Sequence, residues 1–155
     1  MTRPISKEGM DSLMAELRQL KDFERPPVLL AIAAARELGD LSENDEYQSA
    51  KNRQRLIDRR IRELETLIKD SRVVNLEDLK GADKIMFGAF VELEDENGSR
   101  TTWQLLSGSE SDIARGKISV ESPIGRALVG KKAGDLVSIN VPAGKKEFEI
   151  ISVGF

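Results

Sequence analysis

Apolar residues in the first part of the chain recur at the spacing of an α-helix. Steps of three and four residues separate Met10, Leu13, Leu17 and Leu20. Ser6 stands before them and suits the N-cap of a helix, because a serine hydroxyl accepts a hydrogen bond from the unpaired N–H groups at that end. The pattern predicts an N-terminal helix that begins just after Ser6.

Two adjacent prolines interrupt this first helix. Pro26 and Pro27 supply no N–H to the preceding turn and their rings clash with it, so the helix must stop or kink near Glu24. The segment after them, residues 28–38, is apolar and rich in alanine, which favours a second helical stretch. Gly39 follows this stretch and suits a left-handed C-terminal cap.

A long helix is predicted after the glycine. We expect Ser42 to act as its N-cap, and nothing between that residue and about Ser71 breaks a helix. Its apolar positions recur at helical steps, at Ile57, Ile61, Leu64 and Ile68. Two long helices joined by a short turn predict an antiparallel hairpin, in which this apolar stripe packs on the first helix.

The pattern changes to that of β-strands from about Gly81. Strand-like segments occupy residues 84–94, 100–106, 117–120, 136–141 and 147–153, and a strong turn sequence at 96–99 joins the first two. A short helix should begin at Ser122 and Pro123, with the serine as N-cap and the proline at the first helical position.

These patterns together predict an α+β fold. We expect an N-terminal coiled-coil hairpin over residues 1–75, a linker over 76–80, and a small globular α+β domain over 81–155. The tip of the hairpin should lie at residues 37–46.

The composition narrows the possible chemistry. The chain of 155 residues contains neither histidine nor cysteine, which excludes imidazole bases, imidazole or thiolate metal ligands, cysteine nucleophiles and disulfides. With 24 basic against 27 acidic residues the net charge is −3, so strong independent binding of duplex DNA is not expected. No apolar run suits a signal peptide or a membrane span, and we expect a cytoplasmic protein.

The predicted tip gathers acidic residues. Five of them lie within residues 37–46: Glu37, Asp40, Glu43, Asp45 and Glu46. One explanation is structural, because acids in the first turn of a helix complement its dipole. The other is a hard-cation site, since Mg²⁺ prefers oxygen ligands and often takes only one or two protein carboxylates. In that case Asp40 and Glu43 would converge on one ion.

The charge reverses behind the tip. Residues 51–62 carry six basic side chains against one acid, a local net charge of +5. Four of the basic residues share one helical face, at Lys51, Arg55, Arg59 and Arg62. This face is either a solvated surface or a contact for phosphate groups. We favour phosphate contact, because one sign dominates the face while the whole chain is acidic.

The tip sequence resembles that of a known family. Residues 35–50, ARELGDLSENDEYQSA, closely resemble the tip of the bacterial transcript cleavage factors GreA and GreB, and residues 84–93, 118–135 and 142–150 resemble later parts of the same proteins in the same order. The resemblance implies a hairpin that enters the secondary channel of bacterial RNA polymerase. It also implies a globular domain, similar to the peptidyl-prolyl isomerase-like fold, that docks at the rim of that channel.

The activity implied by the resemblance belongs to the polymerase. The chain is then no enzyme itself, but stimulates the polymerase to cleave the 3′ end of nascent RNA in backtracked complexes, with Mg²⁺ as the cofactor. The ion is shared with the polymerase and not stably bound by this chain alone. The tip motif and the segment 122–131 favour GreA, whereas the heavier basic face of residues 55–64 is closer to GreB.

The resemblance also implies roles for single residues. Metal-holding carboxylates match at Asp40 and Glu43. Residues that shape the tip match at Asn44, Glu46 and Tyr47. Basic residues near the RNA match at Arg36 and Lys51, and our helical spacing extends this face to Arg55 and Arg59. The polymerase-docking loop matches at Glu121, Ser122 and Pro123.

Three other classes remain open. A regulator of the same fold could bind the secondary channel and inhibit cleavage instead of stimulating it. A prolyl isomerase needs an aromatic-lined pocket, whereas the second half offers only Trp103 and a few phenylalanines, which we assign to the core. A purely structural coiled-coil adaptor predicts no effect from neutralising the tip.

Overall fold

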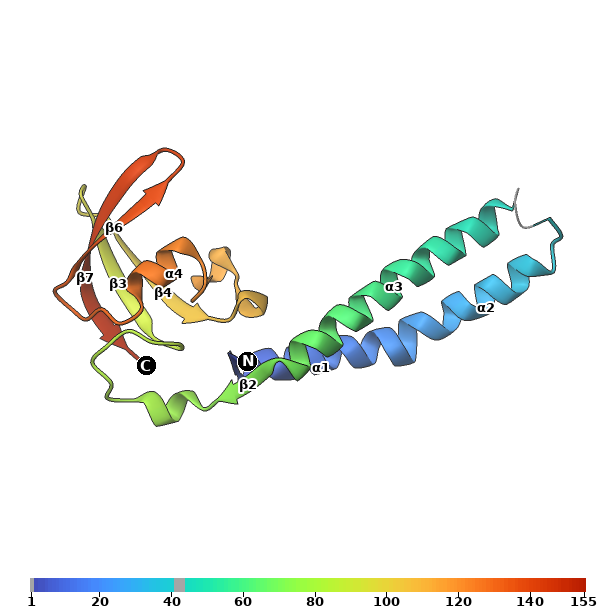
Figure 1. Ribbon diagram of the computed structural model, residues 1–155, viewed down its shortest axis with the longest axis horizontal. Helices are drawn as coiled ribbons and strands as arrows, with labels where there is room; N and C mark the ends of the chain where they lie inside the picture. The colour runs from blue at the N-terminus through green and yellow to red at the C-terminus, as the bar shows by residue number, and fades with distance from the viewer. Residues whose placement is uncertain (1, 41–43) are drawn as a thin grey trace. The chain divides into compact units, whose positions relative to one another are not determined.

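The structure is a computed structural model that describes residues 2–40 and 44–155 (Figure 1). The chain forms two compact units: a helical unit, Met10–Ser71, and a globular unit that combines the residues up to Gly9 with Arg72–Phe155. The predicted α+β class is confirmed, since helices dominate the first unit and a sheet dominates the second.

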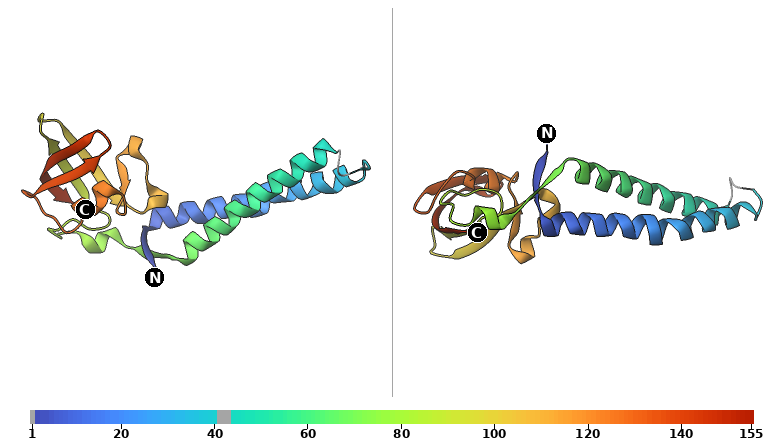
Figure 2. Two further views of the ribbon diagram at one scale, coloured as in Figure 1. Left: turned by 45° about the horizontal axis from the view of Figure 1, so that its top comes forward. Right: turned by 90° about the horizontal axis from the view of Figure 1, so that it is seen from below.

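An antiparallel hairpin of helices makes up the helical unit. Its first leg consists of α1 (Lys7–Arg18), the π-helix η1 (Gln19–Glu24) and α2 (Arg25–Arg36), and its second leg is α3 (Asp45–Lys69). Both views in Figure 2 show the two legs side by side. The predicted N-cap at Ser6 is confirmed, because its hydroxyl oxygen accepts the N–H of Gly9 at 3.0 Å.

The two prolines follow an interruption of the α-helix but do not end the first leg. The π-helix η1 ends at Glu24, and α2 carries the prolines in its first turn. Because Pro26 and Pro27 donate no N–H, carbonyl groups of the preceding turn lose their α-helical partners, and that turn widens. The interruption predicted near Glu24 is therefore a π-helical turn.

An apolar seam holds the two legs together. The buried apolar side chains of the first leg are Met10, Leu13, Leu20, Val28, Ile32 and Ala35, and those of α3 are Ile57, Ile61 and Leu64. The predicted stripe on α3 is thus confirmed for three of its four members, while the fourth, Ile68, is half-buried. Burial of such side chains contributes about 1.5–3 kcal/mol each, so the seam dominates the stability of the hairpin.

Ion pairs flank the seam on its polar edges. Arg60 holds both oxygens of Glu16, at 2.6 and 2.9 Å, and Arg25 Nε lies 2.9 Å from a carboxylate oxygen of Asp58. These pairs join the first leg to α3 on both sides of the π-helix. They also neutralise Arg60, which is therefore not part of the free basic face.

A five-stranded sheet forms the centre of the globular unit. Its strand order is β5–β4–β3–β7–β6, antiparallel except for the parallel pair β4–β5. The strands are β3 (Phe90–Asp95), β4 (Arg100–Leu106), β5 (Lys117–Ser119), β6 (Leu136–Val141) and β7 (Gly144–Gly154). The predicted turn between β3 and β4 is confirmed, with Gly98 at φ 81°.

The helix α4 (Pro123–Leu128) begins at the predicted Ser122–Pro123 pair and covers the core of this unit. Ile85, Val91, Leu93, Leu105, Leu128 and Ile150 are among the side chains buried there. Trp103 packs against this cluster and is half-buried, as predicted for a core residue. No described helix is long and apolar enough to cross a membrane.

The structure differs from the predicted boundaries around the hairpin. The strands β1 (Arg3–Ser6) and β2 (Ser71–Val74) pair in a two-stranded sheet, and both belong mainly to the globular unit. The proposed linker, residues 76–80, contains the 3₁₀-helix η2 (Leu76–Leu79). The first predicted strand is shorter than expected, because Gly88 turns the chain at φ 91° before β3 begins.

The hydrogen bonds from Arg60 lower the pKa of Glu16, which makes the stability of the hairpin depend on pH. A carboxyl group with a lower pKa in the folded state adds stability above its unfolded pKa and loses it as the pH falls through the folded value. Both side chains are about 40% exposed, so we expect Arg60→Gln to cost only about 0.2–1 kcal/mol at pH 7.

That difference between wild type and Arg60→Gln should shrink below about pH 4.3, where Glu16 of the unfolded chain becomes protonated. This difference in the free energy of unfolding is measured by urea unfolding at several pH values, followed by the circular dichroism signal of the helices. A difference that stays constant between neutral pH and pH 3 would show that the pair contributes no pH-dependent stability.

Candidate functional site: the tip and basic face of the hairpin

Asn44 fixes the start of α3 at the tip. Its side-chain oxygen accepts the N–H of Tyr47 at 3.0 Å, and its amide nitrogen donates to the carbonyl oxygen of Ala35 at 2.8 Å. The first bond caps α3, and the second joins the start of α3 to the last turn of α2. The predicted N-cap at Ser42 is wrong: α3 begins at Asp45, one residue after Asn44. Ser42 itself lies outside the described residues.

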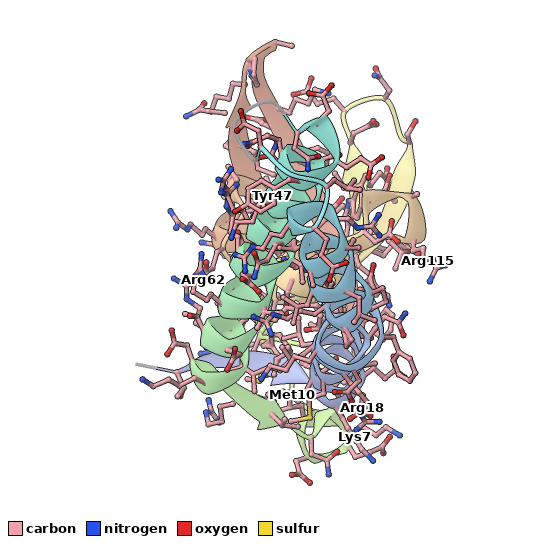
Figure 3. All side chains as sticks on the ribbon, turned by 90° about the vertical axis from the view of Figure 1, so that its right-hand side faces the viewer. Lys7, Met10, Arg18, Tyr47, Arg62 and Arg115 are labelled. Atoms are coloured by element: carbon pink, nitrogen blue, oxygen red, sulfur yellow. The ribbon has the colours of Figure 1, made fainter. Side chains whose placement is uncertain are left out.

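Arg36 and Tyr47 make a second contact between the two legs. The guanidinium carbon of Arg36 lies 5.9 Å from the centre of the Tyr47 ring, within the range of a cation–π interaction. Figure 3, which looks at the hairpin from the tip, shows Tyr47 in the near part of α3. Of the residues that the sequence placed at or near the tip, Arg36, Asn44 and Tyr47 thus lie together where the two legs meet.

Asp40 lies in the turn next to the point where the two legs meet. The preceding residue, Gly39, has a positive φ of 113°, as predicted, and glycine adopts this value without strain. The predicted C-terminal cap at Gly39 is wrong, however, because α2 ends at Arg36 and its C-cap is Glu37. Asp40 is exposed, as are Glu37, Asp45 and Glu46. Glu43 lies outside the described residues.

The dipole explanation accounts for only some of these acids. Asp45 and Glu46 occupy the first turn of α3, where negative charge complements the helix N-terminus. Asp40 precedes that turn by several residues, and Glu37 follows the C-terminal end of α2, where the dipole disfavours an acid. The helix dipole therefore accounts for Asp45 and Glu46 but not for Asp40.

The described acids do not form a complete metal site. Over residues 2–40 and 44–155, no three side chains of the metal-binding types come together. The oxygen donor of Asp40 suits Mg²⁺ by its chemistry, but it supplies only part of a coordination shell. An ion at Asp40 would therefore need further ligands beyond this residue.

The basic face of α3 points away from the apolar seam. Arg55, Arg59 and Arg62 are exposed, and Lys51 is half-buried. Lys51 donates to the side-chain oxygen of Gln54 at 3.1 Å and Arg55 to that of Asn52 at 2.7 Å, and these uncharged amides leave the positive charge of both cations in place. In the described part of the chain, Arg59 and Arg62 have no ion pair. Figure 3 shows Arg62 on the side of α3 away from α2.

The predicted docking loop is held by hydrogen bonds and makes an ion pair with β1. The Ser122 hydroxyl donates to the carbonyl oxygen of Ser119 at 2.7 Å and accepts the N–H of Gly125 at 3.1 Å. Glu121 lies 3.5 Å from Arg3 Nε. Pro123 is exposed at the first position of α4. The loop thus presents a fixed backbone, although it contains no group suited to catalysis by itself.

Sequence reasoning missed a shallow apolar groove on the hairpin. Its volume is about 290 Å³, and Phe23, Pro27, Ala31 and Arg53 are among the residues that line it. The π-helical turn places Phe23 there with 63% of its surface exposed. Helical periodicity could not locate this residue, because the π-turn shifts the angular positions of the side chains.

Comparison with known proteins identifies the relatives of both units. A family model described as the N-terminal part of transcription elongation factors matches residues 3–73, and one described as the GreA/GreB C-terminal part matches residues 80–155. Curated proteins named transcription elongation factor GreA match almost the whole chain. The one from Acidiphilium cryptum is 48% identical over 98% of this chain and 97% of its own length.

Two other proteins named transcription elongation factor GreA also match almost the whole chain. The protein of that name from Nitratidesulfovibrio vulgaris is 48% identical over 98% of this chain and 94% of its own length. The one from Thioalkalivibrio sulfidiphilus is 44% identical over 98% of this chain and 97% of its own. The matches extend over both units in one order, as the resemblance of the tip and of the later segments predicted.

The contacts of Asn44 generate a prediction for stability. Asn44→Ala removes the cap of α3 and the bond to Ala35, and should lower the free energy of unfolding of the hairpin by about 0.5–2 kcal/mol. Urea unfolding followed by helical circular dichroism measures the change. Asn52→Ala, an exposed position within α3, is the matched control and should have little effect. Equal effects of the two variants would show that the cap contributes nothing.

Proposed function

This chain belongs to the GreA/GreB family of transcription elongation factors, and from that premise we propose that it stimulates transcript cleavage by bacterial RNA polymerase. In this proposal the globular unit binds the polymerase at the rim of the secondary channel, and the hairpin enters the channel with its tip first. The tip then reaches the active centre of a backtracked complex, where the 3′ end of the nascent RNA lies. Cleavage there creates a new 3′ end and allows elongation to resume.

The observation that carries the proposal is an exposed acidic residue close to the point where the two legs of the hairpin are joined. Asp40 is exposed, while Asn44 and the Arg36–Tyr47 pair hold the two legs together directly behind it. An exposed carboxylate makes a poor catalyst alone, because nothing around it excludes water or orients a substrate. Such a group gains catalytic value when it enters a site that another protein encloses.

Asp40 and Glu43 are the residues proposed to act at the polymerase active centre. A magnesium ion held there jointly with the polymerase would polarise the phosphodiester and lower the pKa of a bound water. Asp40 contributes an oxygen ligand, and its negative charge favours retention of the cation at the tip. Because this chain supplies only a partial shell, no stable Mg²⁺ binding is expected without the polymerase.

The basic face is proposed to hold the RNA. Lys51, Arg55 and Arg59 carry positive charge along the exposed side of α3, behind the tip. A cation there neutralises a backbone phosphate and gains affinity by releasing counterions. Arg36 can contribute as well, because a guanidinium stacked on Tyr47 still directs its N–H groups outward in its own plane.

The docking loop is proposed to bind the polymerase. Ser122 and Ser119 fix the backbone there by their hydrogen bonds, so little conformational entropy is lost when the loop is bound. Glu121 and Pro123 present one charged and one apolar group on this fixed backbone. The sequence supports this role as well, because residues 118–135, which include the loop, resemble the corresponding part of GreA and GreB.

Neutralising Asp40 tests the proposal. Asp40→Asn keeps the size of the side chain but removes its charge, and should slow cleavage by about a hundredfold or more while leaving polymerase binding unchanged. The assay uses artificially backtracked elongation complexes with labelled RNA, resolved on a gel. Polymerase binding is measured separately by competition with a labelled wild-type chain.

Glu37→Gln is the matched control, since it removes the same charge from another exposed acid of the tip. We expect its cleavage rate to stay close to that of wild type. Equal rates for Asp40→Asn and wild type would contradict the role of Asp40. Wild-type protein that binds without promoting cleavage would instead identify a regulator that occupies the channel and inhibits.

A further inference from the structure

A short loop of the globular unit, between β4 and β5, holds an isoleucine in solvent. Ile113 begins the 3₁₀-helix η4 (Ile113–Arg115), and 73% of its surface is exposed. Its neighbours Ala114 and Arg115 are exposed as well. A single exposed apolar side chain is common on protein surfaces and needs no explanation by itself. The backbone that carries Ile113, however, is fixed by several hydrogen bonds.

Two hydrogen bonds close the loop at its base. Asp112 and Lys117 each donate their backbone N–H to the carbonyl oxygen of the other, both at 2.9 Å. Within the loop, the N–H of Arg115 bonds to the carbonyl oxygen of Asp112 at 3.0 Å, and that of Gly116 to the carbonyl oxygen of Ile113 at 3.1 Å. The Arg115 guanidinium also lies 3.5 Å from the Asp112 carboxylate. Ile113 therefore stands on a backbone with little freedom to move.

Gly116 joins the loop to the neighbouring strand. Its φ of 74° lies in the left-handed region, and its carbonyl oxygen accepts the N–H of Gln104 on β4 at 2.7 Å. A Cβ atom at this position would come within 3.2 Å of the Thr102 carbonyl oxygen, so a larger residue would press on β4. The loop is thus attached to the sheet as well as closed on itself.

This arrangement suits binding better than folding. An exposed apolar side chain contributes little to the stability of the free protein, because burial supplies that stability. A fixed backbone loses little conformational entropy when a partner covers it. Isoleucine adds to this advantage, since its β-branched side chain has few rotamers. The loop therefore presents Ile113 as a preorganised apolar anchor.

The position of the loop indicates its partner. Lys117, at the end of the loop, begins β5, which ends at Ser119, and the docking loop follows directly with Glu121. The Ser119 hydroxyl accepts the N–H of Glu121 at 3.0 Å. Four residues of extended chain span at most about 14 Å, and an interface that buries about 800 Å² on each partner extends farther than this. A partner that binds the docking loop can therefore also reach Ile113.

The charge of this segment favours a protein over a nucleic acid. Residues 112–121 carry two acids, Asp112 and Glu121, against two bases, Arg115 and Lys117. A segment without net charge gains little from the phosphates of RNA or DNA, whose binding depends on an excess of cations. An apolar side chain among balanced charges is instead typical of a protein interface, where a polar rim surrounds an apolar centre.

A second exposed apolar side chain lies at the other edge of the sheet. Leu136 begins β6 and is 76% exposed. In the strand order β5–β4–β3–β7–β6, β5 and β6 are the two outer strands, separated by four interstrand spacings of about 4.8 Å each. Exposure alone therefore does not distinguish Ile113, whereas its place beside the docking loop does. Leu136 is the matched control for this difference.

We propose that Ile113 is a second anchor of the globular unit on RNA polymerase, covered by an apolar surface of the polymerase next to the site that binds the docking loop. This inference rests on the proposed function, because it names the same partner and extends its contact beyond Glu121 and Pro123. The anchor contributes apolar burial, and the docking loop contributes its fixed backbone.

Binding to bacterial RNA polymerase core enzyme tests the proposal, by competition with a fluorescently labelled wild-type chain. Ile113→Thr keeps the β-branched shape but adds a hydroxyl, and should weaken binding about tenfold. Ile113→Val has the shape of the threonine variant without its hydroxyl. It should stay within about fourfold of wild type, since it loses one buried methylene. Both changes are at an exposed position and should leave folding intact, which thermal unfolding checks.

Leu136→Thr is the control and should bind the polymerase as wild type does. Equal binding by Ile113→Thr and wild type would overturn the proposal. An equal loss in Ile113→Thr and Leu136→Thr would overturn it too, because the effect would then follow apolar exposure and not position. A photoreactive residue at position 113 should crosslink to a polymerase subunit, and one at position 136 should not; a missing crosslink from position 113 in a bound complex would contradict the contact.

Glu121→Lys separates this inference from the proposed function. It reverses an exposed charge of the docking loop and should weaken polymerase binding as Ile113→Thr does. Weaker binding by Glu121→Lys with unchanged binding by Ile113→Thr would overturn the anchor at Ile113 alone. A wild-type chain without affinity for the polymerase would overturn the proposed function and the anchor together.

Discussion

The apolar seam between α2 and α3 is the interaction on which the hairpin depends. The buried side chains include Val28 and Ile32 on one leg and Ile57 and Ile61 on the other. The polar faces of the two helices are directed outward. Isolated helices of this composition would be marginal in water, so packing along one stripe supplies most of the stability. Because the seam uses only that stripe, the rest of the surface is free for charge.

Charge separation along the hairpin follows from this arrangement. The sequence places acidic residues at the tip and cations shortly after them in α3. Because α3 is a helix, the acids lie at its start and the cations lie on its outer face. Asn44 and Arg36 fix the tip by bonds that cross between the legs. The end of α2 and the start of α3 are thereby joined next to the tip, which suits an acidic group presented to a partner.

The sequence predicted the features that depend on local pattern. Helical spacing located the stripe at Ile57, Ile61 and Leu64, and turn chemistry located the β3–β4 hairpin at Gly98. The cap of α3 was missed because serine and asparagine suit that position about equally. Pairing of β1 with β2 could not be predicted from local pattern, because the two strands lie far apart in the chain. The sequence predicted where the first helix is interrupted but not that the interruption is a π-helix. Prolines indicate the position of an interruption, but not which conformation the chain adopts there.

The most direct test of the central claim is where the tip lies in a backtracked polymerase complex. A photoreactive residue replaces Leu38, which is exposed at the tip, or Arg18, which is exposed on α1, and the RNA carries a label at its 3′ end. Our account predicts a crosslink from position 38 to the RNA 3′ end, only in backtracked complexes, and none from position 18. Equal crosslinking from both positions, or none from position 38 in a bound complex, would contradict delivery of the tip to the active centre.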